Sequence, residues 1–181
     1  PPPPPPPSGP AASPAVAAYS RAGAAQWAVE HAFDTETYPG ADCTKFVSDA
    51  MSMGGRLAQQ LSWWWYLAPP TPSHSLSWTV AKSFAPEMTN RGYVTSREIN
   101  MSSRVIPGAA LGDVILYDQN YTQGYNHVAI IVEITSNGTA LIAQHSVARS
   151  YRIWNRTWEV EPDATKRAGW HAKLLHIRTD G

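Results

Sequence analysis

Cysteine is nearly absent from this chain, and neither sign of charge is in excess. Cys43 is the only cysteine among 181 residues, which excludes an internal disulfide and a zinc site made of several cysteines. The fourteen basic residues equal the fourteen acidic residues in number and are scattered along the chain. Nucleic acid and anionic membrane surfaces both require clustered positive charge, so we expect neither as a partner.

Long hydrophobic runs are absent as well. No stretch approaches the roughly 20 consecutive apolar residues of a membrane-spanning helix, so we expect no membrane span. The chain starts at proline, and no charged-then-apolar leader precedes its proline tract. We therefore expect a mature form or an excised fragment whose targeting signal lies further upstream.

Proline, by contrast, is concentrated at the N-terminus. Residues 1–18 contain nine of the sixteen prolines and no charged residue. This composition predicts an extended, disordered linker, of the kind that can join a domain to upstream delivery or anchoring domains. Residues 19–181 then have the length of one domain with a single hydrophobic core.

Two helices are predicted near the start of this domain. Apolar residues recur at three- and four-residue spacing between Ser20 and His31. After a break, Asp42 is a good N-cap for a second helix, whose apolar stripe ends at the glycine pair 54–55. Cys43 falls in the first turn of that second helix.

The segment over 57–86 has neither helical nor strand periodicity, so we expect an aromatic loop with a short helix over 78–84. This loop is a candidate rim for a cleft, where aromatic side chains could stack on substrate: Trp63, Trp64, Trp65 and Trp78. Core packing is the alternative for at least two of the three consecutive tryptophans, because aromatic side chains bury a large area.

The second half of the chain predicts strands. Residues 112–118 and 127–134 are rich in β-branched residues and bounded by turn formers, as strands should be. Three further segments are strand candidates: residues 140–146, 151–161 and 172–179. An Asn-Gly pair at 137–138 predicts a hairpin turn between the second and the third segment. Helices followed by consecutive strands indicate an α+β fold, in which N-terminal helices pack on an antiparallel sheet.

A lone cysteine at a helix start is a candidate nucleophile. A free thiol has a pKa near about 8.5 and is mostly protonated at neutral pH. The unpaired N–H groups and the dipole at a helix N-terminus favour the thiolate of Cys43, and an imidazole within hydrogen-bond reach favours it further. His127 begins a strand that should pack behind this helix, so we predict that it is the base. The alternative is that Cys43 is a small buried residue without chemistry.

The base needs a third group that fixes its tautomer. Gln144 and His145 both lie on the strand that returns from the hairpin. A hairpin closed at 137–138 without a bulge would place Gln144 on the face of His127, and a single bulge would place His145 there instead. The residues alone leave both alternatives open.

Four motifs, in their order along the chain, resemble a known family. The segments DCTKFVSDAM, GDVILYD, HVAIIV and AQHS are similar to the papain-like cysteine hydrolases of the NlpC/P60 superfamily, and most closely to its amidase domain group. The resemblance covers residues 19–177. It implies a papain-like α+β fold with Cys43 as nucleophile, His127 as base and His145 as the third residue, since members commonly use histidine there. Lys45 stands where asparagine is usual, which bears on substrate preference.

The resemblance also implies a substrate and a mechanism. Members of the superfamily cleave amide bonds, typically in the peptides of the bacterial cell wall (peptidoglycan), so a secreted or cell-surface location is expected. Cys43 would form a thioester, and His127 would protonate the leaving amine and then activate water. Backbone N–H groups at the helix start, first that of Cys43, would hold the oxyanion, with Asp42 supporting the helix start as its cap. Neither a metal nor an organic cofactor is expected.

Two other functions fit the same residues. A non-catalytic binding module would use the aromatic loop to hold cell-wall glycan or peptide, while Cys43 stays inert. An acyl- or glutaminyl-transferase would keep the thiol chemistry but exclude water. The reactivity of the thiol and the products formed with an added amine distinguish the three functions.

Overall fold

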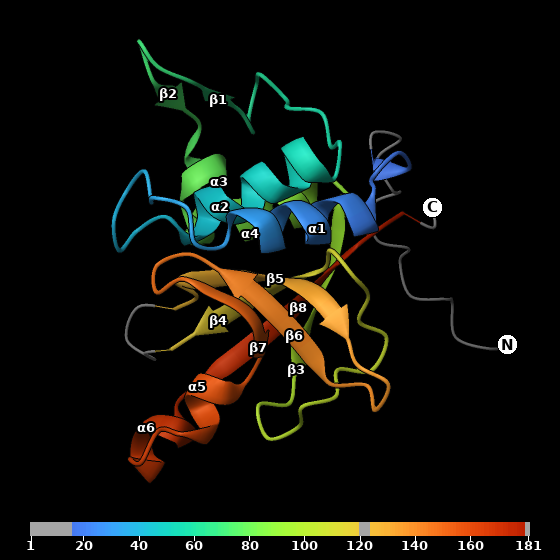
Figure 1. Cartoon of the computed structure of the whole chain (residues 1–181), viewed down its shortest axis with the longest axis vertical. Coiled ribbons are helices and arrows are strands. Elements are labelled where there is room, and N and C mark those ends of the chain that lie inside the picture. The colour runs from blue at the N-terminus through green and yellow to red at the C-terminus, as the bar shows by residue number, and fades with distance from the viewer. Residues whose placement is uncertain (1–15, 120–123, 180–181) are drawn as a thin grey trace, which may run out of the picture.

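The computed structural model of the chain describes residues 16–119 and 124–179. Helices form one layer, and a six-stranded antiparallel sheet forms the other (Figure 1). The expected α+β fold is thereby confirmed. The proline-rich residues 1–15 lie outside the described part, so the linker stays a prediction. Val16, however, is fully buried in the core, so packing begins before residue 19, where the domain was expected to start.

Two successive helical segments supply most of the surface that packs on the sheet. α1 (Arg21–His31) begins after Ser20, whose hydroxyl accepts a hydrogen bond from the N–H of Gly23 at 3.1 Å. α2 (Cys43–Asp49) continues directly into a π-helical turn, η2 (Ala50–Gly54). All residues of α2 are buried, so this helix lies inside the molecule.

The aromatic loop leads into two more helices. A two-stranded hairpin, β1 (Tyr66–Leu67) and β2 (Ser73–His74), projects from the helical layer (Figure 1). It is followed by α3 (Leu76–Thr79) and α4 (Ala81–Asn90). Two helices thus replace the single short helix expected over 78–84, and together they extend beyond it at both ends. None of the helices in the described residues is both long and apolar enough to cross a bilayer.

The main sheet has the strand order β3-β8-β4-β5-β6-β7, and all neighbouring strands are antiparallel. Its last strand in sequence thus lies between β3 and β4. The strands are β3 (Val94–Ile99), β4 (Val114–Asp118), β5 (His127–Ile134), β6 (Ala140–Gln144), β7 (Arg149–Ile153) and β8 (His171–Ile177).

The central strand β5 is buried on both faces. Val128 and Ile130 pack in one hydrophobic cluster with Phe46 of α2, while Ala129 and Ile131 belong to a second cluster on the other face. Because successive side chains of a strand point to opposite faces, a continuous apolar run is the pattern of a doubly covered strand. His127, at the start of this run, is therefore placed at the edge of the core.

One predicted strand is shorter than expected. A strand was predicted over 151–161, but β7 ends at Ile153, and the helical turn α5 (Arg156–Glu159) and the helix α6 (Ala164–Ala168) follow. Asn155 explains the break, because its buried side-chain amide donates to the carbonyl of Met101 at 2.8 Å and turns the chain out of the sheet. Strand β3 was not predicted at all.

Candidate functional site

Cys43 is the first residue of α2 and lies in the wall of a cleft. Its side chain is nearly buried, and its Sγ lies 3.8 Å from the hydroxyl of Thr44. The first helical hydrogen bond runs from the N–H of Phe46 to the carbonyl of Asp42 at 2.9 Å. The N–H groups of residues 43–45 therefore lie outside the helical ladder, where they favour negative charge near the sulfur.

His127, the first residue of β5, lines the same cleft as this thiol and lowers its pKa. Burial raises the pKa of the Cys43 thiol, but the hydrogen bond and the charge of His127 outweigh that effect, with help from the N–H of Val128 and the hydroxyl of Thr44. The pKa of Cys43 therefore lies below its ordinary value. A lowered pKa increases the fraction of thiolate at neutral pH, which is the form that attacks carbonyl carbon.

Gln144, the last residue of β6, is hydrogen-bonded to the ring of His127. Nε2 of His127 lies 3.1 Å from Oε1 of Gln144, and the amide nitrogen of Gln144 donates to the carbonyl of Val147 at 3.0 Å. Because that carbonyl can only accept, the amide oxygen of Gln144 faces the ring, and Nε2 is the ring nitrogen that carries the proton. Nδ1 of the neutral imidazole is thereby left as an acceptor for the thiol proton.

Two register shifts place Gln144, and not His145, beside His127. The hairpin loop is wider than the predicted two-residue turn, because β5 and β6 separate at Thr135–Thr139. A β-bulge in the middle of β5 then shifts the register a second time. Each shift alone would exchange the faces, and the two together restore them. His145, the third residue implied by the family resemblance, does not contact His127 among the described hydrogen bonds, and the alternative, Gln144, does.

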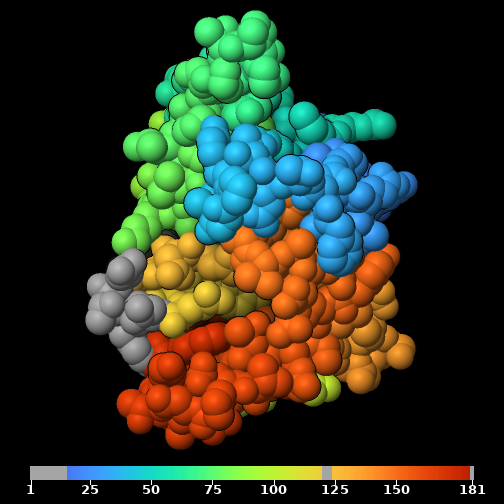
Figure 2. Space-filling view, turned by 60° about the vertical axis from the view of Figure 1, so that its left-hand side comes forward, coloured from blue at the N-terminus to red at the C-terminus, as the bar shows by residue number. Residues whose placement is uncertain are grey.

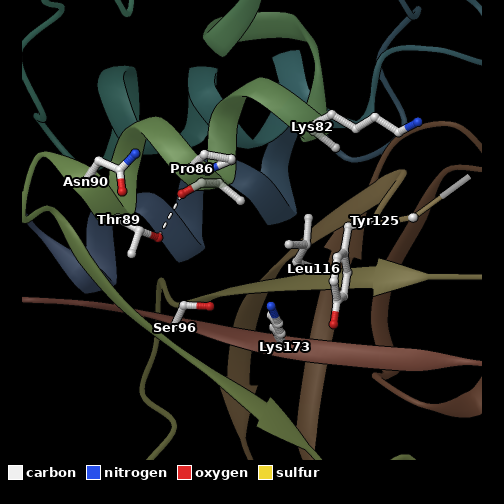
Figure 3. A pocket seen from close by; sticks show the side chains of 11 residues that line it. Lys82, Pro86, Thr89, Asn90, Ser96, Leu116, Tyr125 and Lys173 are labelled. Carbon is white, nitrogen blue, oxygen red and sulfur yellow. Dashed lines mark hydrogen bonds between the residues drawn. The ribbon is translucent and has the colours of Figure 1, made fainter.

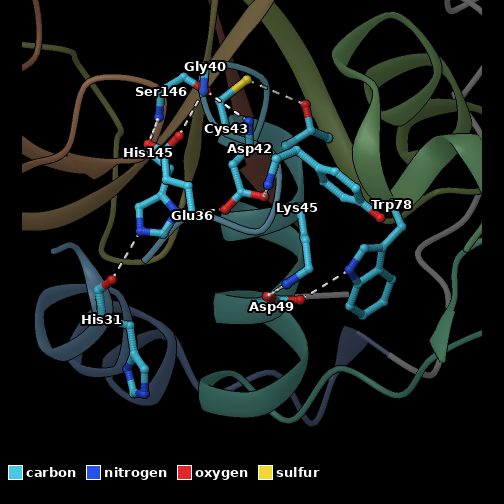
Figure 4. A network of polar contacts seen from close by, with 12 residues as sticks. His31, Glu36, Gly40, Asp42, Cys43, Lys45, Asp49, Trp78, His145 and Ser146 are labelled. Atoms are coloured by element: carbon cyan, nitrogen blue, oxygen red, sulfur yellow. Dashed lines mark hydrogen bonds and ion pairs between the residues drawn. The ribbon is translucent and has the colours of Figure 1, made fainter. Parts of the chain in front are cut away.

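His145 lies instead behind the start of α2, in a buried polar network (Figure 4). Its Nδ1 donates to the carboxylate of Asp42 at 2.8 Å and its Nε2 to the carbonyl of His31 at 3.0 Å, while its ring stacks on Phe46. Burial lowers the pKa of His145, but these two hydrogen bonds and the negative charges of Asp42 and Glu36 outweigh it, so the pKa is raised. Both nitrogens face acceptors, as the protonated ring requires.

Asp42 occupies the predicted N-cap position, but its side chain makes no capping hydrogen bond. The carboxylate is directed to His145, and the backbone N–H of Asp42 donates to the hydroxyl of Ser146 at 2.9 Å. Glu36 in turn accepts from the N–H of Ser146 at 2.6 Å and from the N–H of Gly40 at 2.9 Å. The loop before the cysteine is thus tied to the end of β6. No motif in the sequence pointed to Glu36, and Ser146 was included only as the last residue of the motif AQHS.

Cys43 and His127 line the same cleft, which has a volume of about 420 Å³. Figure 2 shows the hollow, floored by yellow and gold atoms, between the light-blue and green segments on one side and the orange segment on the other. The remaining wall comes from Gly40, Ala41 and Thr44, from residues 79–81 and from single residues of the sheet layer, Gln119, Asn126 and Ser146. A substrate bound here can reach both the sulfur and the imidazole.

The four tryptophans proposed for substrate stacking do not line this cleft. Trp63, Trp64 and Trp78 are buried in the core, and Trp65 is half-buried. The rings of Trp64 and Trp78 pack 4.4 Å apart. Core packing is therefore the role of Trp63, Trp64 and Trp78, because an aromatic ring without exposed surface cannot stack on a ligand.

Lys45, which stands where the family usually has asparagine, also does not line the cleft. Its amine lies 2.6 Å from the carboxylate of Asp49 and 4.7 Å above the ring of Tyr66. Asp49 accepts a further hydrogen bond from the indole of Trp78 at 3.1 Å (Figure 4). Burial raises the pKa of Asp49 despite these partners. The contacts of Lys45 are thus with the core, so its expected bearing on substrate preference has no support in them.

A larger cavity, of about 630 Å³, lies between α4 and the sheet (Figure 3). Pro86 and Thr89 face it from the helix, and Leu116, Tyr125 and Lys173 face it from the other side. Its lining has no cysteine, histidine or carboxylate side chain, so the cleft with the thiol is the better candidate for chemistry. In residues 16–119 and 124–179, no three His, Cys, Asp or Glu side chains are gathered so as to hold a metal ion.

Comparison with known proteins gives a family and one distant relative. The chain matches the family described as "Putative amidase domain" over residues 18–167. It is 27% identical over 144 residues to the uncharacterized protein YhbB of Bacillus subtilis (strain 168), and the match covers 77% of this chain and 43% of that protein. The chain thus spans less than half the length of this relative. No solved structure matches it.

Proposed function

The chain belongs to the "Putative amidase domain" family, and on that premise we propose that it hydrolyses amide bonds with Cys43 as nucleophile, His127 as base and Gln144 as the orienting group. The observation that carries the proposal is that the thiol and the imidazole that lowers its pKa line one cleft, while the amide of Gln144 is hydrogen-bonded to the same imidazole. A nucleophile, an adjacent base and a third group that orients the base are the parts that acyl transfer requires.

The first half-reaction forms a thioester. His127 Nδ1 accepts the thiol proton, and Cys43 Sγ attacks the carbonyl carbon while the carbonyl electron pair moves to the oxygen. The backbone N–H of Cys43, at the helix start, is the donor that we assign to this oxyanion. When the tetrahedral intermediate collapses, the C–N bond breaks and the imidazolium gives its proton to the leaving amine.

The second half-reaction uses water. His127 removes a proton from a water molecule that attacks the thioester carbon, and collapse breaks the C–S bond. The product leaves as a carboxylic acid, and the proton returns to the sulfur. Gln144 accepts from Nε2–H in both halves and so stabilises the ring whenever it becomes positive. Every step uses a group of the chain, the substrate or water.

The substrate that we propose is an amide bond of a bacterial cell-wall peptide, cleaved outside the cell or at its surface. The resemblance of the four motifs to NlpC/P60 hydrolases supports this choice, and the relative YhbB is also bacterial. A cleft of about 420 Å³ has the size of a small-molecule site, so it can hold a short peptide. A papain-like arrangement of helix and sheet is part of the same proposal.

Digestion of isolated peptidoglycan and of its stem peptides, followed by mass spectrometry, tests the proposal. We expect the wild-type domain to release one new amine and one new carboxylate per bond cleaved, and Cys43→Ala to release none. Met53→Ala, at an exposed residue of η2, is the matched control and should keep full activity.

Three other outcomes have defined meanings. Undiminished hydrolysis by Cys43→Ala would contradict the mechanism. Tight binding without hydrolysis would favour the non-catalytic binding module. Formation of a new amide with an added amine, at the expense of hydrolysis, would favour a transferase.

A further inference from the structure

Two arginines of β7 lie beside His127, in a hollow that adjoins the cleft. Arg149 and Arg152 line a space of about 210 Å³. Gln119, His127 and Ser146 line both this hollow and the cleft of Cys43. Besides the two arginines, the rest of the hollow is lined by Gln144, Val147 and Thr157. A molecule held in the cleft can therefore extend past the imidazole into the hollow.

An irregular strand brings the two arginines together. Residues three apart in a regular strand point to opposite faces. In β7, however, Arg149 pairs with Gln144 while Arg152 pairs with Ile142, so one extra residue of β7 lies between the two pairs. Ile142 and Gln144 are two residues apart in β6, so their side chains point to the same face of the sheet. Their partners in β7, Arg152 and Arg149, therefore point to that face as well. Tyr151, inside this bulge, has a φ of 52°, which non-glycine residues adopt only under constraint.

The charge of this pair is not neutralised within the described chain. Ion pairs link basic and acidic residues elsewhere, but among residues 16–119 and 124–179 neither Arg149 nor Arg152 takes part in one. Among the described residues, the guanidinium of Arg149 donates to the carbonyl of Ala148 at 2.8 Å, and that of Arg152 donates to the hydroxyl of Thr157 at 3.4 Å. Burial and then the positive charges of Arg149 and Arg156 lower the pKa of Arg152. Like charges held close together favour an anionic ligand.

We propose that Arg149 and Arg152 form an anion-binding subsite that holds a carboxylate of the amide substrate on the His127 side of the cleft. The inference rests on the proposed function, since it takes Cys43 as the position of the scissile carbonyl. It names the substrate class: amides that carry a free carboxylate a few bonds from the bond that is cleaved. Guanidinium groups suit this ligand because their planar donors match the two oxygens of a carboxylate.

Alkylation of Cys43 by two matched reagents tests the subsite without knowledge of the substrate. N-iodoacetylglycine and N-iodoacetylglycinamide react alike with a thiol and differ in one carboxylate. We expect the ratio of their rate constants, acid over amide, to fall about tenfold in the double variant Arg149→Gln/Arg152→Gln, because charge steering of this order is usual in clefts of one sign. The ratio corrects for any change in the reactivity of the thiol itself.

Two further measurements guard against a double variant that does not fold. Each single variant, Arg149→Gln and Arg152→Gln, should lower the ratio separately. In the wild type, added sodium chloride should lower it too, since salt screens the attraction of the acid and not of the amide. Arg91→Gln, which removes one exposed charge at the C-cap of α4, is the control and should leave the ratio unchanged.

The outcomes separate the subsite from the function on which it rests. If both reagents alkylate Cys43 and the ratio is the same in the wild type and the arginine variants, the subsite is overturned while the reactive thiol stands. If neither reagent alkylates the native wild-type protein, the nucleophile itself is overturned, and the subsite with it.

Discussion

Gln144 determines which nitrogen of His127 carries the proton, although it touches no reacting atom. Its amide oxygen accepts from Nε2, and its amide nitrogen is held by the carbonyl of Val147, so the side chain cannot turn over without losing both contacts. In a catalytic series of this type the orienting residue works by keeping the base in one tautomer and one position. Its contribution should therefore be seen in turnover rather than in substrate affinity.

For Gln144→Ala we predict a kcat lower by about 10- to 100-fold with KM little changed, because the freed ring of His127 can rotate or change tautomer. The pH profile of kcat/KM should shift as well, which loss of packing alone would not cause. Steady-state kinetics on the cleaved peptide measure both. Gln26→Ala, on the exposed face of α1, is the control; wild-type kinetics in Gln144→Ala would contradict the role.

His145 predicts a pH dependence of stability. Its pKa is raised in the folded state, so protonation favours folding. The stabilisation is fully present below the pKa of a histidine in the unfolded chain, about 6.5, and is lost as the pH rises through the folded-state pKa. Urea denaturation of the wild type and His145→Gln at a series of pH values should show a difference of about 3 kcal/mol near pH 6 that shrinks at higher pH. A difference that is constant or grows with pH would contradict a protonated His145.

At this scale the sequence pattern predicts the first two residues of the proposed catalytic series, Cys43 and His127, better than the third. Cys43 and His127 could be predicted because one thiol follows a capping residue and one histidine begins an apolar strand. The choice between Gln144 and His145 could not be made, because it depends on the number of register shifts between two strands. Such shifts arise from three-dimensional pairing and leave no local mark in a short apolar run.

At the scale of elements, the position of α2 depends on two glycines. A Cβ atom on Gly23 of α1 would collide with the carbonyl of Gly54, and a Cβ on Gly54 would collide with the carbonyl of Gly23 and with Trp27. The backbones of α1 and η2 are thus in contact. Because η2 continues α2 without a break, this contact helps to place the helix that carries Cys43.

Gly23→Ala should therefore destabilise the domain, although alanine favours helices. We expect the steric clash with Gly54 to outweigh the gain of up to about 1 kcal/mol in helix propensity and to leave a net loss of about 1–3 kcal/mol. Urea denaturation measures the loss. Ala22→Ser, at the exposed neighbouring residue, is the control and should change stability by less than about 0.5 kcal/mol. A stabilised Gly23→Ala would show that the helices do not meet so closely.

Helices and strands whose apolar residues are buried could be predicted from the sequence. The edge strand β3 and the full length of α4 could not. The first two helices and strands β4, β5 and β8 show a clear apolar pattern because they are covered by other parts of the chain. Strand β3 lies at one edge of the sheet, and four of its six residues are exposed, so its sequence lacks that pattern. Helix α4 contains Pro86, and proline usually ends a helix. The sequence pattern therefore predicted a helix that ends too early.

At the scale of the whole molecule, one buried carboxylate joins the helical layer to the sheet. Asp113 is fully buried before β4 and accepts hydrogen bonds from Arg21 of α1 at 2.6 Å and from His176 of β8 at 2.7 Å. It also accepts from the backbone N–H groups of Ala110 and Ile177. Its contacts with both layers, like the insertion of β8 between β3 and β4, depend on residues far apart in the chain.

Asp113→Ala should cost about 3–5 kcal/mol of folding free energy, because it leaves a partly buried arginine and two N–H groups without their partner. Chemical denaturation followed by circular dichroism measures this loss. Glu87→Ala removes an exposed carboxylate that is paired with Arg91 on α4, and it should cost less than about 1 kcal/mol. Equal losses in the two variants would mean that Asp113 does not join the layers.

The central claim is that the Cys43 thiol is kept reactive by His127, and the pH dependence of its alkylation by iodoacetamide tests this most directly. For the native wild type we predict a rate that rises with an apparent pKa clearly below that of a free thiol, about 8.5. In His127→Ala the apparent pKa should return to that value or exceed it. Burial raises the pKa of the thiol, and the variant lacks the imidazole that lowers it most. An identical profile in the two proteins, or alkylation only after denaturation, would contradict the account.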